Sequence, residues 1–350
     1  MTSWVRAYIP GFSRGGVPLV VEPRRDTSLD GLVSWIADER EVLAGYERTH
    51  GAVLFRGFDV TSPEDFERVA LAVRPDLKND YLGTSPRDAV TTYVFSASEL
   101  PPFYPIPQHC EMSFTANPPE RLFFYCDVAP RSRGGETPLV DFSRVYETIR
   151  ADVRQEFERR GLRIIRNYSG PGSQDRDLWK LKPWHEMFGT TDREAVTARA
   201  IEEGFEPIWR DDDRLTLLSE QPAVRRHPES GVPVWFNHSQ VFHLTTASSE
   251  LLRAGLVDLN VRSLALAAFA GAMVAVRRRV VPAELQAMHC TFRDGGEIPD
   301  AMMAEVRNAI WRNLIRYRWQ RGDAIVIDNF RVSHGRMPYS GPRRVLVAWA

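Results

Sequence analysis

The stretch that decides the fold lies near the end of the chain, where residues 318–336 read RWQRGDAIVIDNFRVSHGR. Within it, Ala324–Ile327 is an aliphatic run with Gly-Asp before it and Asp-Asn after it. A short apolar run between turn residues predicts a buried β-strand. Ile315–Trp319 and Arg344–Trp349 are similarly rich in aliphatic and aromatic residues. The C-terminal block is therefore expected to consist of strands.

Upstream of this block, short strands alternate with helices. The clearest helix start is Ser62-Pro63, an N-cap residue followed by proline at the first helical position. Helices are predicted at 29–46, 63–73, 143–160, 193–203, 248–256 and 299–314, and strands at 52–55, 91–95, 121–126, 137–140 and 162–168. We expect a mainly β chain with flanking helices and a β-barrel or jelly-roll core. No repeat or long linker interrupts it, which favours one domain over residues 1–350 with helical and loop insertions around 143–210 and 245–314.

Composition excludes several classes of protein. The chain has 350 residues, 43% of them hydrophobic, and a formal net charge of −1, so it can bury a core and lacks the basic surface of a nucleic-acid binder. Its three cysteines show no CxxC spacing, which argues against a disulfide framework or a structural zinc site. The N-terminus has no apolar signal region, and Leu264–Val276 is too short to span a bilayer. We expect a cytoplasmic protein without a membrane or nucleic-acid partner.

The residues that point to chemistry are His109-Cys110-Glu111 and, far downstream, His334. Residues i and i+2 of a strand point to the same side, so His109 and Glu111 could reach one ion while Cys110 faces away. Two histidines and one carboxylate on one face of a metal are typical of non-haem Fe(II) oxygenases. With eight histidines in the chain, the HxE pair alone is a weak signal and needs support from other segments.

That support comes from four further segments. Arg318–Asn329 with Ser333–Arg336, and also Gly341–Val345, resemble the closing block of the taurine dioxygenase-like (TauD/TfdA) superfamily of Fe(II)/2-oxoglutarate-dependent dioxygenases. Gly134–Thr137 is similar to the GG(D/E)T turn of that family, and His227–Gly231 to its HPxTG segment. The triplet carries Glu where taurine dioxygenase has Asp, and the run Glu111-Met112-Ser113-Phe114 is most similar to the branch of clavaminate-synthase-like and syringomycin-type amino-acid hydroxylases.

The resemblance implies a double-stranded β-helix core with His109, Glu111 and His334 as iron ligands. It also implies that Arg344, with Thr137, binds the far carboxylate of 2-oxoglutarate. A guanidinium offers a carboxylate two parallel donors, and a hydroxyl can add a third. Arg343 is the neighbouring candidate. We favour Arg344 because successive residues of a strand face opposite ways and because the following Val345 matches the family position, although arginine supplies all but three of the 45 basic residues.

The implied cofactors are Fe(II), 2-oxoglutarate and O₂. The implied reaction is oxidation, most simply hydroxylation, of an unactivated C–H bond in a small amino-acid-like molecule, free or carried on a carrier protein, in natural-product biosynthesis. Desaturation and cyclisation stay open. Ala348 stands where taurine dioxygenase has a second arginine for its sulfonate, which argues against a sulfonate substrate. Glu111 fills the position that related iron halogenases leave small, which argues against chlorination.

Other residues have two interpretations each. Arg87 is a candidate substrate contact or an ordinary surface arginine, and His238 and His243 are expected to be structural or pocket-lining. Asp328 and Asn329 could orient His334 or cap a turn. The loops between 80 and 107 and between 169 and 210 are expected to determine the substrate. Two other classes of protein remain possible: a non-catalytic module that binds a metal or small acid, and a hydrolase that uses Cys110.

Overall fold

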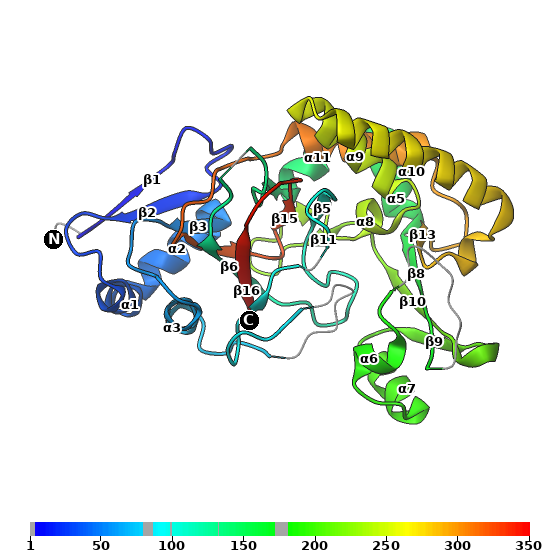
Figure 1. Cartoon of the computed structure of the whole chain (residues 1–350), viewed down its shortest axis with the longest axis horizontal. Helices are drawn as coiled ribbons and strands as arrows, with labels where there is room; N and C mark the ends of the chain where they lie inside the picture. The colour runs from blue at the N-terminus through cyan, green and yellow to red at the C-terminus, as the bar shows by residue number, and fades with distance from the viewer. Residues whose placement is uncertain (1–3, 80–86, 99, 132, 172–180) are drawn as a thin grey trace.

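The structure is a computed structural model that describes residues 4–79, 87–98, 100–131, 133–171 and 181–350. The strands of the described residues form four sheets (Figure 1). The largest sheet has the order β1 (Val5–Tyr8), β2 (Leu19–Pro23), β3 (Ala52–Phe55), β14 (Ala324–Asp328), β6 (Arg121–Val128), β16 (Arg344–Trp349) and β4 (Phe95–Ser96). Its strands are antiparallel except for the parallel pair β2 and β3.

The other sheets are smaller and antiparallel. One has three strands in the order β5 (Ile106–His109), β15 (Val332–Arg336) and β7 (Leu139–Asp141). A second has four strands in the order β13 (Met288–Phe292), β8 (Leu162–Tyr168), β10 (Leu215–Gln221) and β9 (Glu206–Trp209). The last pairs β11 (Arg225–Arg226) with β12 (Pro233–Val234).

Helices gather at the two ends of the molecule, with β5 and β15 between them (Figure 1). They are α1 (Leu29–Asp38), α2 (Arg40–His50), α3 (Pro63–Val73), α4 (Phe142–Thr148), α5 (Ala151–Arg160), α6 (Trp184–Phe188), α7 (Arg193–Glu202), α8 (Ser239–Phe242), α9 (Thr246–Asp258), α10 (Val261–Val280) and α11 (Asp300–Arg312). Short 3₁₀ turns lie at Asp211–Asp213 and Ala283–Leu285. No helix among the described residues combines the length and apolarity needed to cross a membrane.

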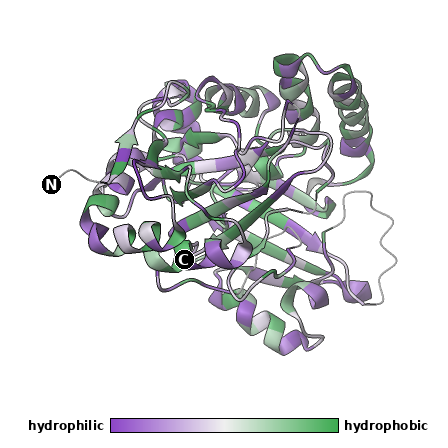
Figure 2. Cartoon of the chain, turned by 60° about the vertical axis from the view of Figure 1, so that its left-hand side comes forward, coloured by the Kyte–Doolittle hydropathy of each residue, from purple (hydrophilic) through white to green (hydrophobic). Residues whose placement is uncertain are grey.

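The aliphatic run near the end of the chain forms the central strand of the main sheet. β14 lies between β3 and β6, and all five of its residues are buried. Ala324 and Val326 pack into one hydrophobic cluster and Ile325 and Ile327 into another. Because helices and strands cover both of its faces, the strand reads as a continuous apolar run rather than an alternating one. Figure 2 shows the same arrangement, with hydrophobic strands inside and helices of mixed hydropathy outside.

Several predicted elements have different boundaries. The helix predicted at 29–46 is two helices that break at Glu39, and the helix predicted at 143–160 breaks at residues 149–150. Asp141, not Ser143, is the N-cap of α4. By contrast, the start of α3 is confirmed, because Ser62 and Asp65 form a reciprocal capping box.

One predicted strand is wrong. Residues 315–319 form no strand: Ile315 makes an isolated bridge to Leu139, and the buried Trp319 instead donates a hydrogen bond to Thr137. The apolar stretch 264–276 belongs to α10, which lies within the insertion predicted around 245–314. Among the described residues, helical residues (about 36%) outnumber strand residues (about 24%), so this part of the chain has sheets plus helices and is not mainly β. That it forms a single domain over 1–350 stays a prediction.

Candidate metal centre

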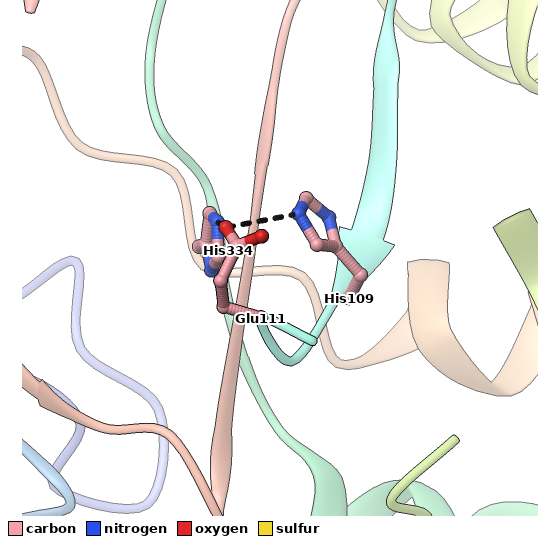
Figure 3. Close-up of side chains that lie close together, drawn as sticks. All are labelled: His109, Glu111 and His334. Atoms are coloured by element: carbon pink, nitrogen blue, oxygen red, sulfur yellow. Dashed lines mark ion pairs between the residues drawn. The ribbon is translucent and has the colours of Figure 1, made fainter. Parts of the chain in front are cut away.

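His109, Glu111 and His334 converge on one point, as Figure 3 shows. One ligand atom from each residue can be chosen so that all lie within 4.8 Å of one another. Glu111 Oε2 is 3.9 Å from His109 Nε2 and 3.7 Å from His334 Nε2. Two imidazole nitrogens and one carboxylate oxygen at this spacing could hold a divalent metal on one face of its coordination sphere.

Strand pairing brings the two histidines together. β15 runs antiparallel to β5, and His334 lies directly opposite His109 in the register. The pairing shifts immediately after this point, between His334 and Arg336. Gly335 fills the shift, because a Cβ there would stand 2.6 Å from the carbonyl oxygen of Ile106. Any larger residue at 335 would force the two strands apart beside the metal ligands.

Glu111 reaches the centre in a way that strand alternation did not predict. β5 ends at His109, and Glu111 lies in the turn that follows, next to Met112 with a φ of 49°. Asn329 holds this turn: its Oδ1 accepts from the Glu111 amide at 2.7 Å, and its Nδ2 donates to the Glu111 carbonyl at 3.0 Å and to the Pro119 carbonyl at 2.8 Å. Asn329 therefore orients Glu111 rather than His334.

The surroundings of both histidines favour the neutral imidazole, the form that binds metals. Burial lowers the pKa of His109 and lowers that of His334 well below its usual value. His109 Nδ1 donates to the carbonyl of Pro107 at 2.9 Å. This bond leaves Nε2, the atom that faces Glu111, with a free lone pair.

Arg87 lies against the same carboxylate. Its Nη2 donates to Glu111 Oε2 at 2.7 Å and its Nη1 to the Ala97 carbonyl at 3.0 Å, and both charged side chains are 5% exposed. Arg87 is therefore no surface arginine. Its contact in the structure is a protein carboxylate, and a contact with substrate stays a prediction. Residues 80–86 of the same loop lie outside the described residues.

A second polar cluster adjoins the centre on the other side of β15. Thr137 and Pro138 precede β7, where Leu139 pairs with His334. Thr137 Oγ1 accepts hydrogen bonds from Trp319 Nε1 at 3.0 Å and from Arg343 Nη2 at 3.1 Å. Because this oxygen accepts two hydrogen bonds, the hydroxyl hydrogen of Thr137 remains available to donate to a third group.

The expectation that Arg344 lies beside Thr137 is wrong. Arg344 projects to the surface, where its side chain is 49% exposed and pairs with Asp127 at 2.8 Å. Arg343 is the inward residue, and its Nε donates to the Gly135 carbonyl at 2.7 Å. The register between β16 and β6 shifts between Arg344 and Val345. Because of this irregularity, strand alternation counted from Val345 does not give the side on which Arg344 lies, and the choice of Arg344 was wrong.

Glycines make the approach of Thr137 and Arg343 possible. Gly134 has a φ of 92°, and a Cβ there would be 2.0 Å from the carbonyl oxygen of Pro338. Only glycine allows this turn to pack against the segment that leads into Arg343. The Gly-Gly pair of the sequence motif thus has a steric cause.

Comparison with known proteins agrees with this geometry. The model of the "Taurine catabolism dioxygenase TauD, TfdA family" matches residues 16–349. The chain belongs to this family. It is an Fe(II)- and 2-oxoglutarate-dependent dioxygenase, and the prediction of that class is confirmed. Fe(II), 2-oxoglutarate and O₂ are the cofactors that the family uses.

Individual relatives cover nearly the whole dioxygenase. The chain is 30% identical to the dapdiamide synthesis protein DdaC of Enterobacter agglomerans, over 95% of this chain and 90% of that protein. It is 31% identical to a clavaminate synthase-like protein of Arabidopsis thaliana, over 92% of this chain and 88% of that one. The fold is similar to that of PvcB, "an Fe, alpha-ketoglutarate dependent oxygenase from an isonitrile synthetic pathway", with a TM-score of 0.54 and 16% identity over 100% of this chain and 92% of that structure.

The side chains of the dioxygenase fit the cofactors of its family. The triad matches Fe(II) in donor type and spacing. Arg343 is half-buried, and desolvation lowers its pKa to about 10, so it keeps its charge at neutral pH. Its hydrogen bonds within the described residues go to a carbonyl and a hydroxyl, with no carboxylate among them. An anionic ligand would supply the missing counter-charge.

His227, in the segment that resembles the family's HPxTG sequence, has a structural role in the dioxygenase. His227 Nδ1 accepts from the amides of Glu229 and Ser230, so its Nε2 donates to Asp328 at 2.8 Å. Asp328 also caps the turn into Phe330. The motif thus stabilises the loop before β15 and provides no metal ligand.

His238 and His243 have different surroundings. His238 lies beside the centre, with its ring 5.5 Å from that of His109 and its Nδ1 2.6 Å from Ser113 Oγ. His243 lines a separate cavity of about 110 Å³ below α10 and bonds Thr245 Oγ1 at 2.8 Å. Both therefore fit the predicted structural or pocket-lining roles.

Proposed function

We propose that this dioxygenase hydroxylates an unactivated C–H bond of an amino acid or amino-acid-derived metabolite in natural-product biosynthesis. The observation that carries the proposal is the complete triad, with Glu111 in the third ligand position. The names of two similar proteins, a dapdiamide synthesis protein and an oxygenase of an isonitrile synthetic pathway, support a biosynthetic role. Presentation of the substrate on a carrier protein belongs to the same proposal.

The proposal includes a double-stranded β-helix core. The three-stranded sheet of β5, β15 and β7 would form one wall and the strands around β14 the other. One contact and one connection support this arrangement. The ring of Phe124, on β6, lies 4.8 Å from that of His334, and a short loop connects Asp328, at the end of β14, to β15. The ligands would then lie inside the barrel, where hydrophobic side chains exclude water.

In this function each residue has a defined task. His109 and His334 would bind Fe(II) through Nε2 and Glu111 through a carboxylate oxygen, while Arg343 and Thr137 would hold the far carboxylate of 2-oxoglutarate. Bound Fe(II) and 2-oxoglutarate supply, with O₂, the oxidising power for hydrogen abstraction. The protein's own contribution is to fix these groups before substrate binds, since Asn329 and strand pairing already hold the ligand geometry.

The surroundings also narrow the reaction. The Glu111 side chain occupies the position that a halogenase would need open for chloride, which favours hydroxylation over chlorination. Ala348 is buried in the core of the main sheet, so it offers no cation to a sulfonate. Desaturation or cyclisation would use the same triad and is the alternative outcome of the product analysis below.

The test is a substrate screen scored by conversion of 2-oxoglutarate to succinate. Free amino acids and the same amino acids bound to a carrier protein are compared, with mass analysis of each product. A gain of one oxygen atom indicates hydroxylation, and a loss of two hydrogens indicates desaturation or cyclisation. His109→Ala and His334→Ala should abolish iron binding and turnover together, and wild-type activity in either variant would refute the triad.

Two other functions predict different results. A non-catalytic binding module would give no visible charge-transfer band with anaerobic Fe(II) and 2-oxoglutarate, and no succinate. A Cys110 hydrolase would turn over without O₂ and be insensitive to chelators. Cys110 is fully buried, and burial raises its pKa well above the usual value. A thiol that stays protonated is a poor nucleophile, which speaks against the hydrolase.

A further inference from the structure

Arg166 is a fully buried arginine that the chemistry described so far does not use. It lies on β8, its exposed fraction is 0%, and none of its three guanidinium nitrogens has a hydrogen-bond partner among the described residues. Burial lowers its pKa. Protein interiors very seldom leave a charged, five-donor group wholly unsatisfied, because its desolvation is costly. Such a group in a native protein indicates a missing ligand.

The neighbours of Arg166 are apolar rings rather than acids. Its guanidinium carbon lies 4.5 Å from the ring centroids of both Phe114 and Phe205 and 5.8 Å from that of Tyr168. Tyr168, buried on the same face of β8, partly opposes the fall in the pKa of Arg166, but its hydroxyl makes no hydrogen bond of normal geometry in the described part of the chain. Aromatic faces hold the guanidinium in place without using its N–H donors.

This arrangement lies next to the metal centre. Phe114 follows Glu111 by three residues, and its ring packs edge-on against His238 at 4.8 Å. His238 in turn packs against His109, with 5.5 Å between ring centroids. Two successive rings, Phe114 and His238, therefore connect Arg166 to the iron ligand His109.

From this geometry we infer that Arg166 anchors a carboxylate of the substrate, with the Tyr168 hydroxyl as a further donor. The inference rests on the proposed function and narrows it to substrates with an acidic group remote from the oxidised carbon. The planar guanidinium matches a carboxylate with two parallel N–H donors. The Phe114 and Phe205 rings would cover the apolar part of the ligand nearest to it.

The test compares Arg166→Met with Arg307→Met in the full-length protein. Arg307 is a matched control, because it is equally buried but donates to Thr245 and Thr246 at 2.8 Å each. Without ligand, Arg307→Met should lower Tm, whereas Arg166→Met should leave Tm unchanged or raise it, since it removes an unsatisfied charge. A loss of Tm in Arg166→Met as large as in Arg307→Met would show that Arg166 is structural and would overturn the inference.

The second arm measures binding with the anaerobic Fe(II) and 2-oxoglutarate complex. Free L-amino acids, their C-terminal amides and inorganic phosphate are the probes, and thermal stabilisation is the readout. Acids should stabilise the wild type more than their amides do, and Arg166→Met should weaken acid binding at least about tenfold while its charge-transfer band is retained. Equal stabilisation by acids and amides, equal acid binding by Arg166→Met, or stabilisation by phosphate alone would refute the inference. A wild type without the charge-transfer band would instead refute the proposed function.

Discussion

At the scale of single residues, the two neighbouring arginines of the GPRR segment lie in different surroundings. Arg343 is half-buried and donates to Gly135 and Thr137, whereas Arg344 forms an exposed ion pair with Asp127. Strand alternation correctly implied that the two face opposite sides. It could not say which side each one faces, because a bulge lies between Arg344 and Val345.

This difference gives the first prediction. Arg343→Met should raise the 2-oxoglutarate concentration needed for half-saturation about 10- to 100-fold, because a charge-assisted hydrogen bond contributes about 1.5–3 kcal/mol. Arg344→Met should leave it unchanged, since an exposed ion pair contributes about 0–1 kcal/mol and does not reach the site. Titration of the charge-transfer band measures both. The opposite ranking would restore Arg344 as the 2-oxoglutarate ligand.

At the scale of elements, the position of Glu111 depends on a contact between two loops. β5 supplies His109 and then ends, and Asn329, in the loop between β14 and β15, holds the turn that carries Glu111. The loop before His334 thus also sets the third ligand. The loop between β14 and β15 therefore positions two ligands that are far apart in the sequence, Glu111 and His334.

Asn329→Ala tests this coupling. The variant loses three buried hydrogen bonds and should be destabilised by about 2–3 kcal/mol. Its affinity for Fe(II) should also fall by about 10- to 100-fold, as is usual when a group that orients a ligand is removed. Asn237→Ala is the matched control, because Asn237 also makes three buried hydrogen bonds, to Ala223 and Ser239. Equal iron affinity in the two variants would contradict the positioning role of Asn329.

At the scale of the whole molecule, stability depends on histidines that are buried in the neutral form. His243 is the clearest example: its side chain is 0% exposed, and burial, with Arg307 and His289 nearby, lowers its pKa to about 3 against the opposing effect of Asp300. The unfolded chain binds this proton near pH 6.5. The stabilising effect is therefore complete above pH 6.5 and is lost as the pH falls from 6.5 toward 3.

His243→Gln measures this contribution. Between pH 6 and pH 4, the free energy of unfolding of the wild type should fall more steeply than that of the variant. The difference in slope should be about 1.4 kcal/mol per pH unit, the value for one proton. Urea unfolding at several pH values gives both slopes. Parallel slopes would mean that His243 is already protonated in the folded protein at these pH values.

The sequence by itself determined the chemistry of the protein and much of its local structure. Residue types at fixed spacing pointed to the triad, and the family resemblance implied Thr137. Short-range rules located β14, β8 and the start of α3, because a buried strand and a capping box depend on neighbours in sequence. Only the tertiary structure decided four features: the turn at Glu111, the side of the sheet that Arg343 and Arg344 face, the burial of Arg87, and the lack of partners for Arg166. Each of these depends on a bulge, on the end of a strand or on a partner that is distant in sequence. Local sequence pattern carries no information about such contacts.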